Sequence, residues 1–170
     1  MNGENLSCNQ PCKEILFMNP VFTHNMWGGT KLREEFGYAV EGDDIGECWG
    51  IAAHPNGTCT IAKADLSIQV HPDDTYAAEH EKGSLGKMEC WYILDCEPDS
   101  KLVIGHNAKT HEELEDMVHN GRRSELIREV PVKKGDFIQI DPGTVHAIKG
   151  GITILETQQN SDITYRVYDY

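Results

Sequence analysis

The segment Leu66-Ser67-Ile68-Gln69-Val70-His71 alternates apolar and polar side chains, and Pro72-Asp73-Asp74 ends it with turn-forming residues. Alternation with a period of two is the pattern of a β-strand that buries one face. Further short segments with strand character, separated by Gly and Pro turns, lie at 46–54, 89–95, 101–105, 135–141, 144–148, 152–158 and 163–170. Many short strands with few helices predict an all-β barrel or sandwich.

One helical insertion is expected around residues 110–128. Thr110 is a suitable N-cap, because its side-chain oxygen can accept from a free backbone N–H in the first turn. Leu114, Met117 and Val118 then recur at positions i, i+3 and i+4, which places them on one apolar face of a helix.

Length and charge bound the class of protein. The chain has 170 residues, which suits one compact domain, and its formal net charge is −13. That charge argues against nucleic acid or an anionic membrane as a partner, since both need a basic surface. The first residues lack the apolar segment of a secretory signal, and the six cysteines form no C-x-x-C pair. We therefore expect a cytoplasmic protein with reduced thiols.

Four residues carry side chains suited to a metal ion. Gln69 and His71 are two residues apart on one predicted strand, so both can point to the same side. Glu89 begins the next clear strand, and His146 follows a Pro-Gly turn. Imidazole and carboxylate are usual ligands of zinc, and this set would leave the ion strongly Lewis acidic. Any one histidine taken alone is more simply interpreted as a packed or solvated residue.

Several motifs then carry a resemblance to a known family. The three longest lie at 66–74, 86–92 and 141–148, and shorter ones lie at 27–32, 46–49, 155–159 and 164–170. In this order they resemble the motifs of type I mannose-6-phosphate isomerases, a family of the cupin superfamily, and most closely its short bacterial branch. The resemblance covers nearly the whole chain from about Asn19 onward.

The resemblance implies a cupin, jelly-roll-like β-barrel that holds one zinc ion and interconverts mannose 6-phosphate and fructose 6-phosphate. By their places in the motifs, the zinc ligands would be Gln69, His71, Glu89 and His146. The oligomeric state is left open.

The resemblance also places other residues near the substrate. Ser67 and Lys87 match pocket residues that can contact the substrate phosphate, and Arg166 matches an active-site arginine. Aldose–ketose isomerisation moves a proton between C1 and C2, so it needs stabilisation of negative charge and a group that carries the proton. Arg166 suits the first role because its planar guanidinium stays charged. For the second role, Lys87, Glu156 and a zinc-bound water are all candidates.

Two departures from the family give an alternative function. Family members usually carry a helical insert between the 54–57 loop and the strand that begins near Ala64, and they continue into a second β domain. We therefore expect residues 1–14 as a lead-in and 15–170 as the cupin catalytic domain, without the second domain. A non-catalytic cupin that binds metal and sugar phosphate is the alternative.

Overall fold

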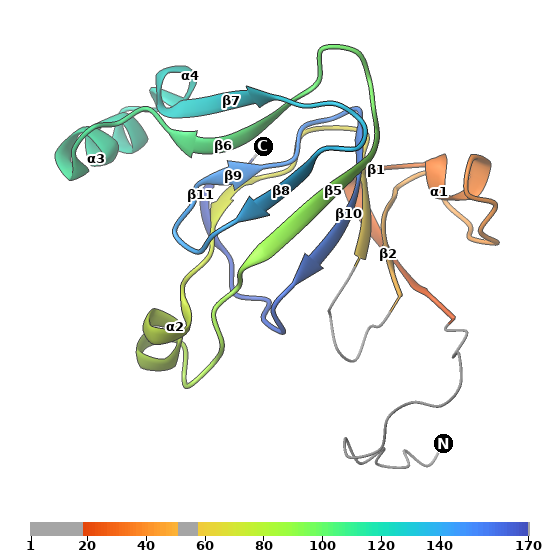
Figure 1. Cartoon of the computed structure of the whole chain (residues 1–170), viewed down its shortest axis with the longest axis horizontal. Coiled ribbons are helices and arrows are strands. Elements are labelled where there is room, and N and C mark those ends of the chain that lie inside the picture. Colours follow the sequence, from red (N-terminus) through yellow and green to blue (C-terminus); the bar gives the residue numbers. More distant parts are fainter. Residues whose placement is uncertain (1–18, 51–57, 170) are drawn as a thin grey trace.

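The computed structural model describes residues 19–50 and 58–169, and the strands in this part form two antiparallel sheets (Figure 1). The strands are β1 (Val21–Gly29), β2 (Ile45–Trp49), β3 (Thr58–Ala62), β4 (Ile68–Val70), β5 (Glu89–Cys96), β6 (Lys101–His106), β7 (Ile127–Pro131), β8 (Phe137–Ile140), β9 (His146–Ala147), β10 (Ile152–Gln158) and β11 (Tyr165–Tyr168). One sheet has the order β1-β2-β3-β10-β5-β8 and the other β11-β4-β9-β6-β7. The all-β barrel or sandwich predicted from the sequence is confirmed.

The main core lies between the two sheets, because both contribute to it. Its buried members are Ala62, Trp91, Ile93, Leu102, Ile140, Ile148, Ile152 and Ile154. Along β5 the buried side chains of Glu89, Trp91 and Ile93 alternate with the less buried Cys90 and Tyr92, as the pleat of a strand requires. Burying such a cluster is the main source of the barrel's stability.

The barrel interior changes character along its strands. On β10 the inward side chains are, in order, Ile152, Ile154, Glu156 and Gln158. On the neighbouring β5 they are Glu89, Trp91 and Ile93, with Ile93 opposite Ile154 and Glu89 opposite Gln158. We call the half around Ile93 and Ile154 the apolar end, and the half around Glu89, Glu156 and Gln158 the polar end.

The described residues also form four short helices outside the barrel: α1 (Lys31–Glu34), α2 (Asp74–His80), α3 (His111–His119) and α4 (Arg123–Leu126). The insertion expected around 110–128 is confirmed, since α3 and α4 lie between β6 and β7 at one side of the molecule (Figure 1). Thr110 caps α3, and its hydroxyl accepts from the Glu113 N–H at 3.2 Å.

Some elements differ from the expectation. The sequence did not predict β1, β3, β7 or α2, and β4 ends at Val70 rather than at His71. Pro72 explains the early end, since it has no N–H to continue the sheet ladder. The expected lead-in 1–14, and residues 15–18 after it, lie outside the described residues. Among the described helices, none has the length and apolar character needed to cross a membrane.

Candidate metal centre and its cavity

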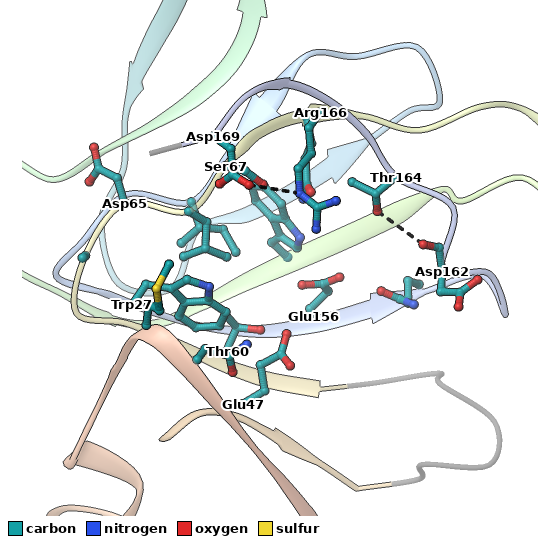
Figure 2. Close-up of a pocket in the computed structure, with 18 of the residues that line it drawn as sticks. Trp27, Glu47, Thr60, Asp65, Ser67, Glu156, Asp162, Thr164, Arg166 and Asp169 are labelled. Carbon is teal, nitrogen blue, oxygen red and sulfur yellow. Dashed lines mark hydrogen bonds and ion pairs between the residues drawn. The ribbon is translucent and has the colours of Figure 1, made fainter. Parts of the chain in front are cut away.

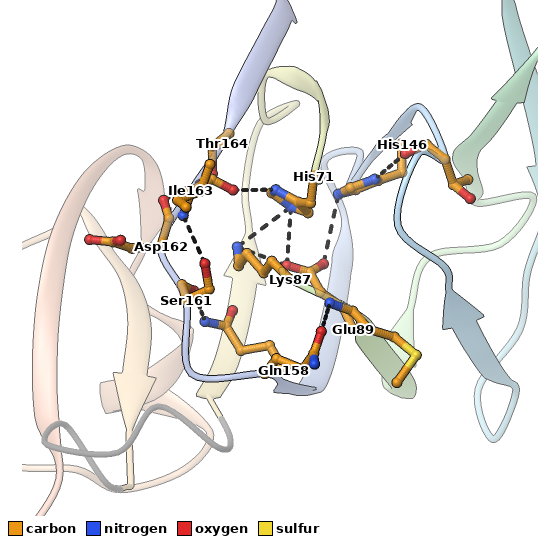
Figure 3. Close-up of polar contacts among 12 residues, drawn as sticks. His71, Lys87, Glu89, His146, Gln158, Ser161, Asp162, Ile163 and Thr164 are labelled. Carbon is orange, nitrogen blue, oxygen red and sulfur yellow. Dashed lines mark hydrogen bonds and ion pairs between the residues drawn. The ribbon is translucent and has the colours of Figure 1, made fainter. Parts of the chain in front are cut away.

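His71, Glu89 and His146 meet at the polar end of the barrel. They come from the residue after β4, the start of β5 and the short β9. One potential ligand atom from each lies within 4.8 Å of the others, and all three side chains are buried. Nε2 of His71 is 3.2 Å from Glu89 Oε1, and Nε2 of His146 is 3.7 Å from Glu89 Oε2 (Figure 3).

Both imidazoles are oriented by backbone carbonyls. Nδ1 of His71 lies 2.8 Å from the Ile163 oxygen, and Nδ1 of His146 lies 2.8 Å from the Thr144 oxygen. A carbonyl can only accept, so each Nδ1 donates a hydrogen bond to its carbonyl, which leaves each Nε2 directed toward Glu89. His146 Nε2 is buried with no hydrogen-bond partner among the described residues.

This arrangement fits a divalent metal ion. Two imidazole nitrogens and a carboxylate oxygen lie close together in a buried place, where a divalent cation between them would be stabilised by all three. Ligating histidines commonly donate their other ring N–H to a carbonyl or carboxylate, as both do here. Two imidazoles and a carboxylate are also ligands that zinc accepts.

The surrounding charges favour the protonation states that a metal needs. Burial on its own would raise the pKa of Glu89, but its contact with His71 and the charge of Lys87 outweigh burial and lower that pKa to about 2. Burial also lowers the pKa of His146 to about 4. Near pH 7 the carboxyl is therefore ionised and His146 is neutral, as metal binding requires.

Lys87 lies within this cluster. Its Nζ is 2.8 Å from Glu89 Oε1 and 3.5 Å from His71 Nε2, and only 9% of its surface is exposed. The ammonium therefore partly neutralises the carboxylate in the structure described here.

A cavity of about 640 Å³ opens beside the cluster (Figure 2). All of the sequence-predicted site residues other than His71, Glu89 and His146 line it: Ser67, Gln69, Lys87, Glu156 and Arg166. Cavities of this size hold small organic ligands.

Register explains how distant segments reach this cavity. Gln69 of β4 lies opposite His146 of β9 on one side and opposite Arg166 of β11 on the other. Ser67 lies just before β4 and is half-buried. Arg166 is more exposed, and its Nε lies 3.6 Å from Asp169 Oδ2.

Glu156 is buried in the cavity wall, where β10 pairs with β5 and Trp91 lies opposite. Burial first, then the negative charge of Glu89, raises the pKa of Glu156 well above its usual range. The buried environment of Glu156 therefore favours the protonated carboxyl.

A polar network that includes two residues of the cavity wall was not predicted from the sequence. Glu47 Oε2 accepts from the Thr23 hydroxyl at 2.6 Å and from the Trp49 indole N–H at 3.2 Å. Glu47 and Trp49 line the cavity. Both residues belong to the motif 46–49, which lies on strand β2, and this motif was the feature of the sequence that could have indicated them.

The chain is similar in sequence and in structure to proteins that are already known. The chain is 46% identical over 194 residues to mannose-6-phosphate isomerase ManA of Bacillus subtilis, covering 92% of this chain and 61% of that protein. The crystal structure of a mannose 6-phosphate isomerase from Bacillus subtilis superposes with a TM-score of 0.87 at 41% identity, covering 91% of this chain and 61% of that one. The chain is a homologue of the mannose-6-phosphate isomerases. The cupin fold implied by the motifs is confirmed.

Two further comparisons show how far this similarity extends. A mannose 6-phosphate isomerase solved with zinc and yttrium shares the fold, with a TM-score of 0.62 at 15% identity over 87% of this chain and 68% of that chain. No family model matches the chain.

The chain is shorter than these isomerase relatives. It spans 61% of the length of the curated relatives it matches. The alignment with the Bacillus subtilis protein runs over 194 positions, more than the 170 residues of this chain, so part of the relative inside the aligned region has no counterpart here.

Proposed function

We propose that this chain is a metal-dependent aldose–ketose isomerase that interconverts mannose 6-phosphate and fructose 6-phosphate, with zinc as its ion. The convergence of His71, Glu89 and His146 beside a large polar cavity carries the proposal. Homology to mannose-6-phosphate isomerases supports the choice of substrate. We propose Gln69 as the fourth ligand, because its amide oxygen is a hard donor and it lines the same cavity.

The ion and the cationic side chains of the cavity would stabilise negative charge on the substrate. When bound, a divalent ion would supply Lewis-acid stabilisation for the negative charge that develops on the substrate oxygens. Arg166 would bind an anionic oxygen through its guanidinium, which can donate two parallel hydrogen bonds. Ser67 would donate or accept a hydrogen bond at the phosphate end of the substrate, and Lys87 would add a positive charge there.

A proton must also move between C1 and C2 of the sugar. Lys87 and Glu156 both line the cavity next to Glu89, so either can reach a substrate bound beside the cluster. The raised pKa of Glu156 makes this carboxyl a better proton donor than an exposed carboxylate would be. A water molecule in the cavity is the third candidate.

A coupled assay tests the proposal. Zinc-loaded protein is given mannose 6-phosphate, and fructose 6-phosphate is measured with and without EDTA. We expect turnover that EDTA abolishes and that added zinc restores. Lys87→Met and Glu156→Gln, assayed in parallel, then show which side chain carries the proton, since only loss of that group removes proton exchange with solvent at C2.

The second candidate is a cupin that binds metal and sugar phosphate without turnover. The gap inside the aligned region favours it, because the segment of the relatives that has no counterpart here can include groups that close over the substrate. Calorimetry separates the two functions: binding of mannose 6-phosphate by the zinc-loaded protein without product formation would support the second. A cytoplasmic location remains a prediction.

A further inference from the structure

The loop 86–88, which directly precedes Glu89, is held in place by hydrogen bonds from three consecutive backbone N–H groups. The Gly86 N–H donates to Asp74 Oδ1 at 2.8 Å, the Lys87 N–H to the Pro72 oxygen at 3.0 Å, and the Met88 N–H to Gln159 Oε1 at 2.8 Å. This loop leads directly into Glu89, so its position sets where both Lys87 and the Glu89 carboxylate lie.

The two side chains that hold the loop also contact each other. Gln159 Nε2 donates to Asp74 Oδ1 at 3.4 Å, and the Gln159 N–H donates to the Met88 oxygen at 2.9 Å. Asp74 and Gln159 therefore form one bridge between α2, the loop before β5 and the chain after β10.

The bridge connects the segments that carry the candidate ligands. Asp74 and Pro72 follow His71 directly in the chain, and Gly86 and Lys87 precede Glu89. A side chain at Gly86 would not fit, because its Cβ would lie 2.5 Å from the Asp73 carbonyl carbon and 2.8 Å from the Pro72 oxygen. The loop thus packs against the very residues that follow His71.

We propose that Asp74 and Gln159 are positioning residues of the metal centre, which hold the 86–88 loop so that Glu89 and Lys87 face His71. This proposal rests on the proposed metal site but not on turnover. Partners of this kind, one step removed from the ion, commonly change metal affinity when they are lost, since they fix the orientation of the ligands.

Zinc affinity, measured by chelator competition on the full chain, tests the bridge. We expect Asp74→Ala to weaken zinc binding by about 10- to 100-fold. Asp74→Asn keeps an oxygen that can accept from the Gly86 N–H, so it should recover most of the affinity. Gln159→Met removes both contacts of that amide and should weaken binding in the same direction.

The neighbouring residue offers a matched control. Asp73 is the N-cap of α2 and its Oδ1 accepts from the Tyr76 N–H at 2.7 Å, but its side chain does not hold the 86–88 loop. Asp73→Ala should lower the melting temperature through loss of a helix cap while zinc affinity stays within about twofold.

The outcomes separate this inference from the proposed function. Unchanged zinc affinity in both Asp74→Ala and Gln159→Met would overturn the bridge, even if the wild-type chain is an active isomerase. An equal loss of affinity in Asp73→Ala would also overturn it, because the effect would then follow from α2 stability alone. A 10-fold or larger loss restored by Asp74→Asn would support it, even if no turnover is found.

Discussion

The two ends of the barrel interior are built on the same strands and differ only in which side chains point inward. At the apolar end, Ile93 and Ile154 face each other across β5 and β10 and are fully buried among other aliphatic residues. At the polar end of the same two strands, Glu89 and Glu156 are buried as well. Burial therefore stabilises the protein at one end and costs free energy at the other.

The apolar end contributes stability, whereas the polar end holds the buried groups that are proposed to bind metal and substrate. Buried polar atoms without a hydrogen-bond partner among the described residues include His146 Nε2, Thr60 Oγ1 and Trp91 Nε1, and Thr60 and Trp91 line the cavity. Such groups are unfavourable in a folded protein unless function uses them. The apolar end offsets this cost, and the four predictions below test that division.

Removing a ligand should have the largest effect. We expect His71→Ala to lose stoichiometric zinc and to lower turnover at least about 100-fold, because the charge on the substrate oxygens is then poorly stabilised. Metal analysis and the coupled assay measure both. His80→Ala removes a half-exposed histidine of α2 and should change neither. Retained zinc in His71→Ala would remove this residue from the ligand set.

Arg166→Ala should lower kcat about 100-fold while zinc content stays unchanged, because Arg166 lines the cavity and is not one of the three clustered residues. Steady-state kinetics and metal analysis on one preparation give both values. Arg33→Ala, which removes an arginine paired with Asp43 at 3.0 Å, is the control. Turnover near the wild-type value would show that Arg166 has no role in the reaction.

At the apolar end we expect a substitution to lower stability and to leave zinc binding unchanged. Ile93→Ala should lower the free energy of unfolding by about 2–5 kcal/mol, because it opens a cavity in a fully buried cluster. Zinc content per folded molecule should not change. Leu155→Ala lies on the outer face of β10, 45% exposed, and should change stability by less than about 0.5 kcal/mol. Loss of zinc in Ile93→Ala would mean that the two ends are coupled.

The smallest effect is expected for Thr60→Val in the wall of the cavity. The valine removes an unpartnered buried hydroxyl and should raise the free energy of unfolding by about 1 kcal/mol. Chemical denaturation measures this change. Thr153→Val serves as the control, since Thr153 is equally buried and its hydroxyl is not among the unpartnered groups. A destabilised Thr60→Val would indicate that the hydroxyl is satisfied in solution.

The local pattern of the sequence predicted the well-alternating strands and the capped helix. Ile152, Ile154 and Glu156 recur with a period of two in the segment 152–158, which is strand β10, and Thr110 is the N-cap of α3. β7 was missed because Arg128 and Glu129 interrupt the apolar pattern on an edge strand that is largely exposed. Helix α2 was missed because Asp73 and Asp74 read as a turn, whereas Asp73 is the helix cap.

The candidate site was accessible to sequence reasoning only in part. Motif resemblance named the ligands, but their convergence depends on strand pairing over long distances, such as Gln69 opposite His146. Periodicity gives the face of a residue and not the partner strand, so it could not show which residues meet. The bridge from Asp74 to Gln159 spans 85 positions and left no local signal.

Strand β9 consists only of His146 and Ala147, yet it joins β4 to β6 within the five-stranded sheet. His146 thus pairs with two neighbouring strands through its backbone, while its imidazole is a proposed metal ligand. If the ion binds there, we expect its release to loosen this sheet, so that amide hydrogens of β4 and β6 exchange faster in the metal-free protein.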